Sequence, residues 1–156
     1  MSQTKLKVRR ATAEDVETIA EFNCRLAQET ENKTLDQNTV TEGVRRGLRC
    51  GPEVTYFMAV IGQQPVGTLM LTREWSDWRN GWIAWLQSVF VSESYRGQGV
   101  FRSMLNQVLE EMESDPDVIG VRLYVENENT RAQQVYQRSG FADPNYRVLE
   151  RLRSQA

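Results

Sequence analysis

The sequence contains no histidine among its 156 residues. This absence excludes Ser-His-Asp and Cys-His catalysis, and it also excludes zinc sites that depend on imidazole ligands. Any proton transfer must use carboxylates, Tyr, Lys, Cys or water. Cysteine is scarce as well: Cys24 and Cys50 give neither a disulfide framework nor a metal-binding spacing. We expect two free thiols in a reducing compartment rather than a disulfide.

Long apolar runs and an excess of one charge are also missing. No stretch approaches the ~20 apolar residues that cross a bilayer. The segment Met1–Lys7 lacks the apolar core of a secretory signal. We therefore expect a cytoplasmic protein with no membrane partner. The net charge is −2 with both signs interspersed, which gives no global attraction to nucleic acid.

The apolar periodicity predicts alternating strands and helices within one domain, residues 1–156. Strands are expected at 6–10, 54–61, 66–72, 82–91, 118–126 and 146–152, and helices at 16–27, 36–48, 101–113 and 132–139. The polar stretch 29–34 is predicted to be a loop. Thr12–Asp15 has the letters of a capping box before the first helix. The order β-α-α-β-β-β-α-β-α-β indicates a mixed α/β fold.

A glycine-rich turn lies between a predicted strand and a predicted helix. The strand ends Val89-Phe90-Val91, and the turn reads Arg96-Gly97-Gln98-Gly99-Val100-Phe101. Glycines let the main chain approach a ligand closely, and the first helical turn offers unpaired N–H groups at the positive end of the helix dipole. Strand, turn and helix together are suited to bind a diphosphate.

Two well-known phosphate-binding motifs do not match this turn. A P-loop requires Gly, four intervening residues and then Gly-Lys-Ser/Thr, and the chain has no such run. A dinucleotide fingerprint requires a third glycine where Arg102 stands. The turn resembles instead the acetyl-CoA loop of the GNAT N-acetyltransferases, Arg/Gln-x-x-Gly-x-Gly/Ala. Arg96 and Gly99 match this pattern, and Phe101 departs from it.

A second motif, distant in the chain, strengthens this resemblance. Residues 129–141 read Asn-Thr-Arg-Ala-Gln-Gln-Val-Tyr-Gln-Arg-Ser-Gly-Phe. They are similar to the GNAT signature Asn-x-x-Ala-x-x-x-Tyr-x-x-x-Gly-Phe at every fixed position. The two motifs stand in the family's order. The resemblance extends over roughly Lys5 to Arg151 and is weak before Val54.

The resemblance implies a GNAT-type fold and an acetyl-CoA-dependent N-acetyltransferase. The expected fold is a mostly antiparallel twisted sheet with a splay between the fourth and fifth strands and about four helices. Acetyl-CoA would bind in that splay as co-substrate, with no metal. A primary amine of a small molecule or peptide would attack the thioester directly.

The resemblance also assigns residues to the bound acetyl-CoA. The backbone of Val89, Phe90 and Val91 would pair with the pantetheine arm. The diphosphate would lie on the N–H groups from Gly97 to Arg102, which include those of Gln98, Gly99, Val100 and Phe101. Arg96 and Arg102 would add positive charge. The helical stripe Phe101, Met104, Leu105 and Val108 predicts that the Phe101 ring points to the core.

Two residues of the second motif acquire roles in the same way. Tyr136 resembles the general acid that protonates the leaving thiolate. A phenol with a pKa near ~10 stays protonated at pH 7 and can give its proton to a sulfur with a pKa of ~8.5. Packing on an amphipathic helix is the alternative role for Tyr136. Asn129 resembles a residue that contacts acetyl-CoA or caps that helix.

The general base is not determined by the motifs. Many family members carry a Glu on the strand before the loop, where this chain has Gln87. Glu74, Asp77 and Glu126 are the candidate replacements. Glu74 is preferred because it is predicted to lie in the loop that enters the strand.

Four tryptophans, Trp75, Trp78, Trp82 and Trp85, lie within eleven residues. With the nearby carboxylates they would suit a cationic amine. They would equally suit cross-strand packing or a subunit interface, which would make the protein a homodimer. Glu29 and Glu31, predicted in a loop, would border the acceptor groove or simply face solvent.

Two other functions compete with acetyl transfer. Gln87 and Phe101 favour a non-catalytic acyl-CoA-binding or regulatory module of the same fold. A nucleotide-binding domain is the third reading, and the missing third glycine argues against it.

Overall fold

Five strands and four helices form the part of the chain that this computed structural model describes, residues 5–154. In chain order they are β1 (Leu6–Arg10), α1 (Val16–Glu31), α2 (Gln37–Gly47), β2 (Val54–Ile61), β3 (Gln64–Ser76), β4 (Gly81–Val91), α3 (Val100–Ser114), β5 (Val118–Leu123) and α4 (Thr130–Arg138). Single 3₁₀ turns, η1 (Ala13–Asp15) and η2 (Glu93–Tyr95), precede α1 and follow β4.

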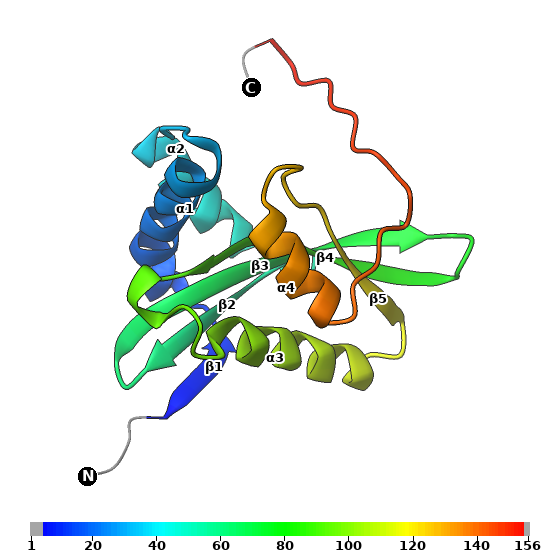
Figure 1. The fold of residues 1–156 in the computed structure, drawn as a ribbon, viewed down its shortest axis with the longest axis horizontal. Helices are drawn as coiled ribbons and strands as arrows, with labels where there is room; N and C mark the ends of the chain where they lie inside the picture. Colours follow the sequence, from blue (N-terminus) through cyan, green and yellow to red (C-terminus); the bar gives the residue numbers. More distant parts are fainter. Residues whose placement is uncertain (1–4, 155–156) are drawn as a thin grey trace. The chain divides into compact units, whose positions relative to one another are not determined.

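The strands form one sheet in the order β1-β2-β3-β4-β5 (Figure 1). The first four strands are antiparallel, and β5 runs parallel to β4. The β4–β5 pairing stops at Leu86 opposite Leu123, although β4 continues to Val91. The predicted mixed, mostly antiparallel fold with a splay between the fourth and fifth strands is therefore confirmed.

Helices cover both faces of this sheet. Side chains of β2 alternate between the faces, as expected for a strand buried on both sides. Tyr56 and Met58 belong to a core cluster with residues of α1 and α2, whereas Phe57 and Ala59 belong to a second cluster with residues of α3. Figure 1 shows α1 and α2 on one side of the sheet and α3 on the other. Each face thus has its own apolar core.

A buried carboxylate fixes the start of α1. The Asp15 carboxylate accepts a hydrogen bond from the Thr12 backbone N–H at 2.7 Å, which is the reciprocal half of the predicted capping box. The Arg9 guanidinium donates to both oxygens of the same carboxylate at 2.7 and 2.9 Å. Asp15 is 7% exposed, whereas the Arg9 side chain is 44% exposed, so β1 and the start of α1 are tied together by a bidentate pair in which the carboxylate is buried.

Several predicted boundaries were wrong. Glu29 does not lie in a loop, because α1 continues to Glu31 and ends where Asn32 adopts a left-handed conformation. Glu74 does not lie in a loop either, because β3 extends to Ser76 along the whole of β4. Strand β5 ends at Leu123 rather than at residue 126.

The predicted last strand, 146–152, is absent: these residues have no regular secondary structure. Their apolar side chains are exposed, and Leu149 is 91% exposed. A strand needs a neighbouring strand for its backbone hydrogen bonds. The local alternation of apolar residues does not supply that neighbour, which is why the pattern alone misled the prediction.

Contacts divide the chain into two compact units, the first ending at Leu123 and the second beginning at Tyr124. The first contains the sheet with α1, α2 and α3, and the second contains α4 and the segment that follows it. No helix within residues 5–154 is long and apolar enough to cross a membrane.

Candidate active site

The glycine-rich turn between β4 and α3 exposes its main chain. Gly97 and Gly99 adopt φ angles of 74° and 81°, a left-handed conformation that side chains rarely tolerate. A Cβ built at either glycine would meet no atom within 4 Å. The backbone of this turn is therefore open on the side where a Cβ would project, which leaves room for a ligand.

The amides of this turn are also available. The N–H groups of Gly97, Gln98, Gly99, Val100 and Arg102 donate to no acceptor among residues 5–154. They precede or begin a helix of 15 residues, whose dipole places partial positive charge at the same end. Unpaired amides next to a helix N-terminus make a site for an anion such as a phosphate.

Strand β4 carries a bulge just before this turn. The register with β3 shifts between Thr68 and Met70. Two residues of β4, Ser88 and Val89, therefore face Leu69 alone. Ser88 has a φ of 51°, which is uncommon for a residue with a side chain. The bulge bends β4 at the point where β5 no longer accompanies it.

The end of β4 combines a filled core with an open backbone edge. Phe90 is 2% exposed and contacts Phe22 of α1, and Val89 and Val91 pack against the core cluster beneath α3. Beyond Leu86, no strand of residues 5–123 pairs with the edge of β4 opposite β3. The side chains thus stabilise the interior while the edge can accept an extended ligand.

The two arginines of the turn differ in their surroundings. The Arg96 guanidinium donates to Glu29 of α1 at 2.5 Å, and its Nε donates to the Val91 carbonyl at 2.8 Å. Glu29 therefore partly balances the charge of Arg96, and the Arg96 side chain covers the end of β4. Arg102 is exposed in the first turn of α3 and forms no ion pair with the described residues. Both remain predicted contributors of positive charge.

Phe101 packs as its helical position predicts. Its ring lies against the core cluster that contains Val100, Met104 and Val108. Val100, which the predicted stripe omitted, is the more deeply buried residue at 2% exposure. The large side chain at position 101 is thus directed to the interior.

In the second unit, the signature Asn-x-x-Ala-x-x-x-Tyr-x-x-x-Gly-Phe corresponds to a helix with both ends capped. Asn129 Oδ1 accepts from the Ala132 N–H at 3.2 Å, which is an N-cap. At the other end Gly140 has a φ of 94°, and the Phe141 N–H donates to the Tyr136 carbonyl at 3.0 Å. This is a Schellman motif, which explains the spacing of Tyr136, Gly140 and Phe141 in the signature.

The Schellman motif brings two rings together. The Tyr136 and Phe141 rings are 5.8 Å apart in an edge-to-face arrangement. Burial raises the pKa of the Tyr136 phenol above its ordinary value of 10.0. Tyr136 therefore keeps its proton throughout the neutral range.

Neither Gln87 nor Glu74 has a side chain free of partners. The Gln87 amide donates to the Thr72 hydroxyl at 2.5 Å. Glu74 lies on β3 opposite Ile83 and forms an ion pair with Arg122 at 2.7 Å. Along β4, Ile83 is five residues from Ser88, or about 16 Å at ~3.3 Å per residue. Glu74 is thus distant from the bulge.

The tryptophans do not form one cluster. Trp75 and Trp82 face each other across β3 and β4, with ring centroids 5.0 Å apart, which is the cross-strand packing considered as an alternative. Trp78, in the β3–β4 turn, is 87% exposed. Trp85 has the Arg122 guanidinium 5.8 Å from its ring. A role for Trp78 in a homodimer stays a prediction.

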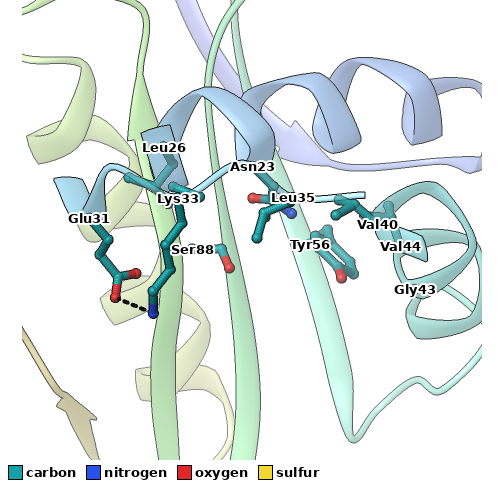
Figure 2. A pocket seen from close by; sticks show the side chains of 11 residues that line it. Asn23, Leu26, Glu31, Lys33, Leu35, Val40, Gly43, Val44, Tyr56 and Ser88 are labelled. Carbon is teal, nitrogen blue, oxygen red and sulfur yellow. Dashed lines mark hydrogen bonds and ion pairs between the residues drawn. The ribbon is translucent and has the colours of Figure 1, made fainter. Parts of the chain in front are cut away.

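A pocket of about 530 Å³ lies within the first unit, between the α1–α2 pair and the sheet (Figure 2). Asn23 of α1, Tyr56 of β2 and Ser88 of β4 supply polar groups to its lining. Ser88 is the bulge residue, so the pocket adjoins the point where β4 leaves β5. At one end Glu31 and Lys33 form an ion pair at 3.2 Å.

A family model for the acetyltransferase (GNAT) family matches residues 17–141 of this chain. The chain belongs to the GNAT acetyltransferase family. A similar solved structure is a possible acetyltransferase from Clostridium difficile 630, with 37% identity and a TM-score of 0.87 over 94% of this chain and 97% of the other. The predicted family membership is confirmed.

More distant structures share the GNAT fold alone. A predicted acetyltransferase with acetyl-CoA from Clostridium acetobutylicum has 16% identity and a TM-score of 0.76, covering 94% of this chain and 96% of its own. A ribosomal-protein-alanine N-acetyltransferase from Brucella melitensis biovar Abortus 2308 has 11% identity and a TM-score of 0.77, covering 95% and 99%. No curated protein sequence gave a match.

The pocket of this GNAT protein was not predicted from the sequence. Asn23 and Tyr56 come from α1 and β2, which lie in the part of the chain where the family resemblance is weak. Asn23 interrupts the apolar stripe of α1 with a polar side chain on the same helical face as Ile19 and Ala27. A polar residue on a buried helical face was the available signal.

Proposed function

We propose that this GNAT protein is an acetyl-CoA-dependent N-acetyltransferase that moves an acetyl group to a primary amine of a small molecule or peptide by direct attack. We propose further that residues 1–156 function as one acetyltransferase domain. One observation carries the proposal: the unpaired amides of Gly97, Gln98, Gly99, Val100 and Arg102 line an open main-chain turn directly after the end of β4, where no strand of residues 5–123 pairs on the side opposite β3. Family membership supports the same activity.

The described residues fit the proposed ligand. The amides of Gly97, Gln98, Gly99, Val100 and Arg102 would hold the diphosphate, and the open space beside both glycines would accommodate it. The Phe101 amide belongs to the same helical turn. The edge of β4 at Val89–Val91, which no strand of residues 5–123 pairs, would bind the extended pantetheine arm as an added strand does, and Arg96 would then release the Val91 carbonyl. Arg96 and Arg102 would contribute positive charge beside the phosphates.

Acetyl-CoA supplies an activated thioester when bound. The chain must then supply proton transfers, because an amine with a pKa of ~10 is protonated at pH 7 and freeing its lone pair costs about 4 kcal/mol. The new C–N bond forms as the C–S bond breaks, and the amine releases a proton. Glu74 is our candidate acceptor of that proton, and its distance from the bulge means that it would act through a chain of water molecules.

Tyr136 is the proposed general acid. Burial keeps its phenol protonated, so that its Oη can donate a proton to the leaving sulfur and recover it from water. Asn129 would hold the start of α4 through its cap and thereby help to fix Tyr136 two turns later. The aromatic contact with Phe141 would restrict the Tyr136 ring.

The second candidate function is a non-catalytic acyl-CoA-binding module. The hydrogen bond between Gln87 and Thr72 favours it, because the residue at this strand position is an amide with no proton-accepting role. Both functions use the same turn, and they differ in whether the bound thioester reacts.

One assay separates the candidates. The full chain is incubated with acetyl-CoA and a panel of amines that includes monoamines, polyamines, amino acids and peptide N-termini, and thiol release is followed together with the acetylated product. The proposal predicts amine-dependent thiol release with a matching amount of acetylamine. Binding of acetyl-CoA without turnover on any amine would support the non-catalytic module. Tighter binding of a nucleotide lacking pantetheine would contradict both.

A further inference from the structure

The pocket between the α1–α2 pair and the sheet contains an unsatisfied polar atom. Asn23 Oδ1 is buried and is the one buried side-chain oxygen or nitrogen without a hydrogen-bond partner among the described residues. A buried acceptor without a donor is unfavourable, and native proteins keep such groups chiefly where a ligand or water satisfies them. Figure 2 shows the Asn23 side chain, from α1, among the side chains that line the pocket.

The pocket has almost no charge to offer a polycation. Its carboxylate, Glu31, is already paired with Lys33 at 3.2 Å, so that the two charges cancel. Binding of a polyamine or an aminoglycoside would require several uncompensated carboxylates, because each desolvated ammonium group needs a partner. The pocket therefore favours a ligand with a single amino group.

The remaining lining suits an apolar body. Leu26, Leu35, Val40 and Val44 present aliphatic side chains to the pocket. Gly43 of α2 has open space beside it, since a Cβ there would meet no atom within 4 Å. This unfilled volume next to Val40 and Val44 can hold an aliphatic or aromatic group of several carbon atoms.

From these observations we infer that the pocket binds the acceptor and selects monoamines with an apolar body, with Asn23 accepting a hydrogen bond from the amino group. This inference rests on the proposed acetyl transfer, and it adds to that proposal the class of acceptor. Asn23 is a specificity-determining residue that orients the nitrogen toward the bulge at Ser88. The aliphatic walls bind the rest of the molecule.

The test measures amine binding directly, apart from turnover. The full chain is titrated calorimetrically with 2-phenylethylamine and with spermidine, in the presence and absence of coenzyme A. The inference predicts that 2-phenylethylamine binds at least about tenfold more tightly than spermidine. Equal or tighter binding of spermidine, or the failure of both amines to bind, would overturn it.

Two variants locate the binding. Replacing the buried acceptor with an isosteric apolar group, Asn23→Leu, should weaken 2-phenylethylamine binding about tenfold without lowering the thermal midpoint, because the lost acceptor has no protein partner. Gly43→Leu should fill the open volume and weaken binding by a similar or larger factor. Asn38→Leu, at an exposed position of α2 outside the lining, is the matched control.

The outcomes separate this inference from the proposed function. Unchanged affinity in both variants would overturn the inference, because the amine would then bind outside this pocket. A fall of several degrees in the midpoint of Asn23→Leu with unchanged affinity would likewise overturn it and leave Asn23 with a structural role. Thiol release with spermidine but not with 2-phenylethylamine would overturn the inference and leave acetyl transfer standing. Binding of 2-phenylethylamine as predicted, with no thiol release from acetyl-CoA with any amine, would overturn the proposed transferase activity. The inference that the pocket binds a monoamine would then still stand.

Discussion

The Tyr136 ring packs edge-to-face against the Phe141 ring, with the centroids 5.8 Å apart. Both residues are held by a Schellman motif in which the Phe141 N–H donates to the Tyr136 carbonyl. A Tyr136→Phe substitution keeps the ring and this contact, and it removes only the hydroxyl. The role of the hydroxyl can therefore be tested without disturbing the packing.

We predict that Tyr136→Phe lowers kcat about 100-fold while the dissociation constant of acetyl-CoA changes less than about twofold, because general acid catalysis typically contributes 10²–10⁴-fold. Burial raises the pKa of this phenol above 10.0, so the wild-type kcat should not decline through loss of this proton below about pH 10. Steady-state thiol release and calorimetry measure both quantities. Tyr95→Phe is the matched control, and equal kcat values for the two variants would reject the general acid.

Phe101 is predicted to stabilise the core without obstructing the ligand. Phe101→Ala should lower the free energy of unfolding by about 2 kcal/mol, because the half-buried ring packs against the cluster beneath α3. Its effect on coenzyme A affinity should be less than about twofold. Urea unfolding and calorimetric titration of the same samples measure these effects. A gain of tenfold or more in affinity would show that the wild-type ring crowds the site.

Glu74 is predicted to act as a general base through water. Glu74→Gln should reduce kcat/KM for the amine about tenfold at pH 7, and the loss should disappear as the pH approaches ~10, where the amine deprotonates without help. Glu113→Gln, an exposed carboxylate on α3, controls for the change of charge. Parallel pH profiles for wild type and Glu74→Gln would leave Glu74 with only its ion pair to Arg122.

The boundaries that the sequence predicted correctly were those with a strong local cause. Asp36 caps α2 by accepting from the Thr39 N–H at 2.8 Å, as its position before the apolar stripe indicates. The strand 54–61 was predicted in full because its apolar residues are buried on both faces of the sheet. The glycines at 97 and 99 likewise have the left-handed conformations that make glycine necessary.

The failures come from interactions with distant partners. Residues Arg73–Ser76 look polar and loop-like, yet they are β-strand because each pairs with a residue of β4. Residues 146–152 alternate like a strand and have no strand partner. The pocket could not be predicted for the same reason, since its residues come from four elements brought together only by the fold. Local propensity describes neither pairing nor cavities.

The pair between Arg9 and Asp15 gives a prediction about stability and pH. The hydrogen bond from Arg9 lowers the pKa of Asp15 below its ordinary value of 3.8. The stability from this pair is therefore present above about pH 4 and is lost as the pH falls toward the lower, folded-state value. Asp15→Asn should lower the free energy of unfolding by about 1–2 kcal/mol at pH 7 and by less at pH 3.

Urea unfolding at the two pH values measures this difference. Glu14→Gln is the matched control, because its exposed carboxylate lies beside Asp15 and forms no ion pair with the described residues. A loss in Asp15→Asn that is equal at pH 3 and pH 7 would show that the charge of Asp15 does not contribute.

The most direct test of the account follows backbone amide resonances of isotopically labelled protein by NMR during a titration with coenzyme A. The amides of Gly97, Gln98, Gly99, Val100 and Arg102 are unpaired in the described chain, so a bound diphosphate should shift them downfield more than the other amides of α3. Saturation with coenzyme A that leaves these five resonances in place while others move would contradict the account, because the diphosphate would then be held elsewhere.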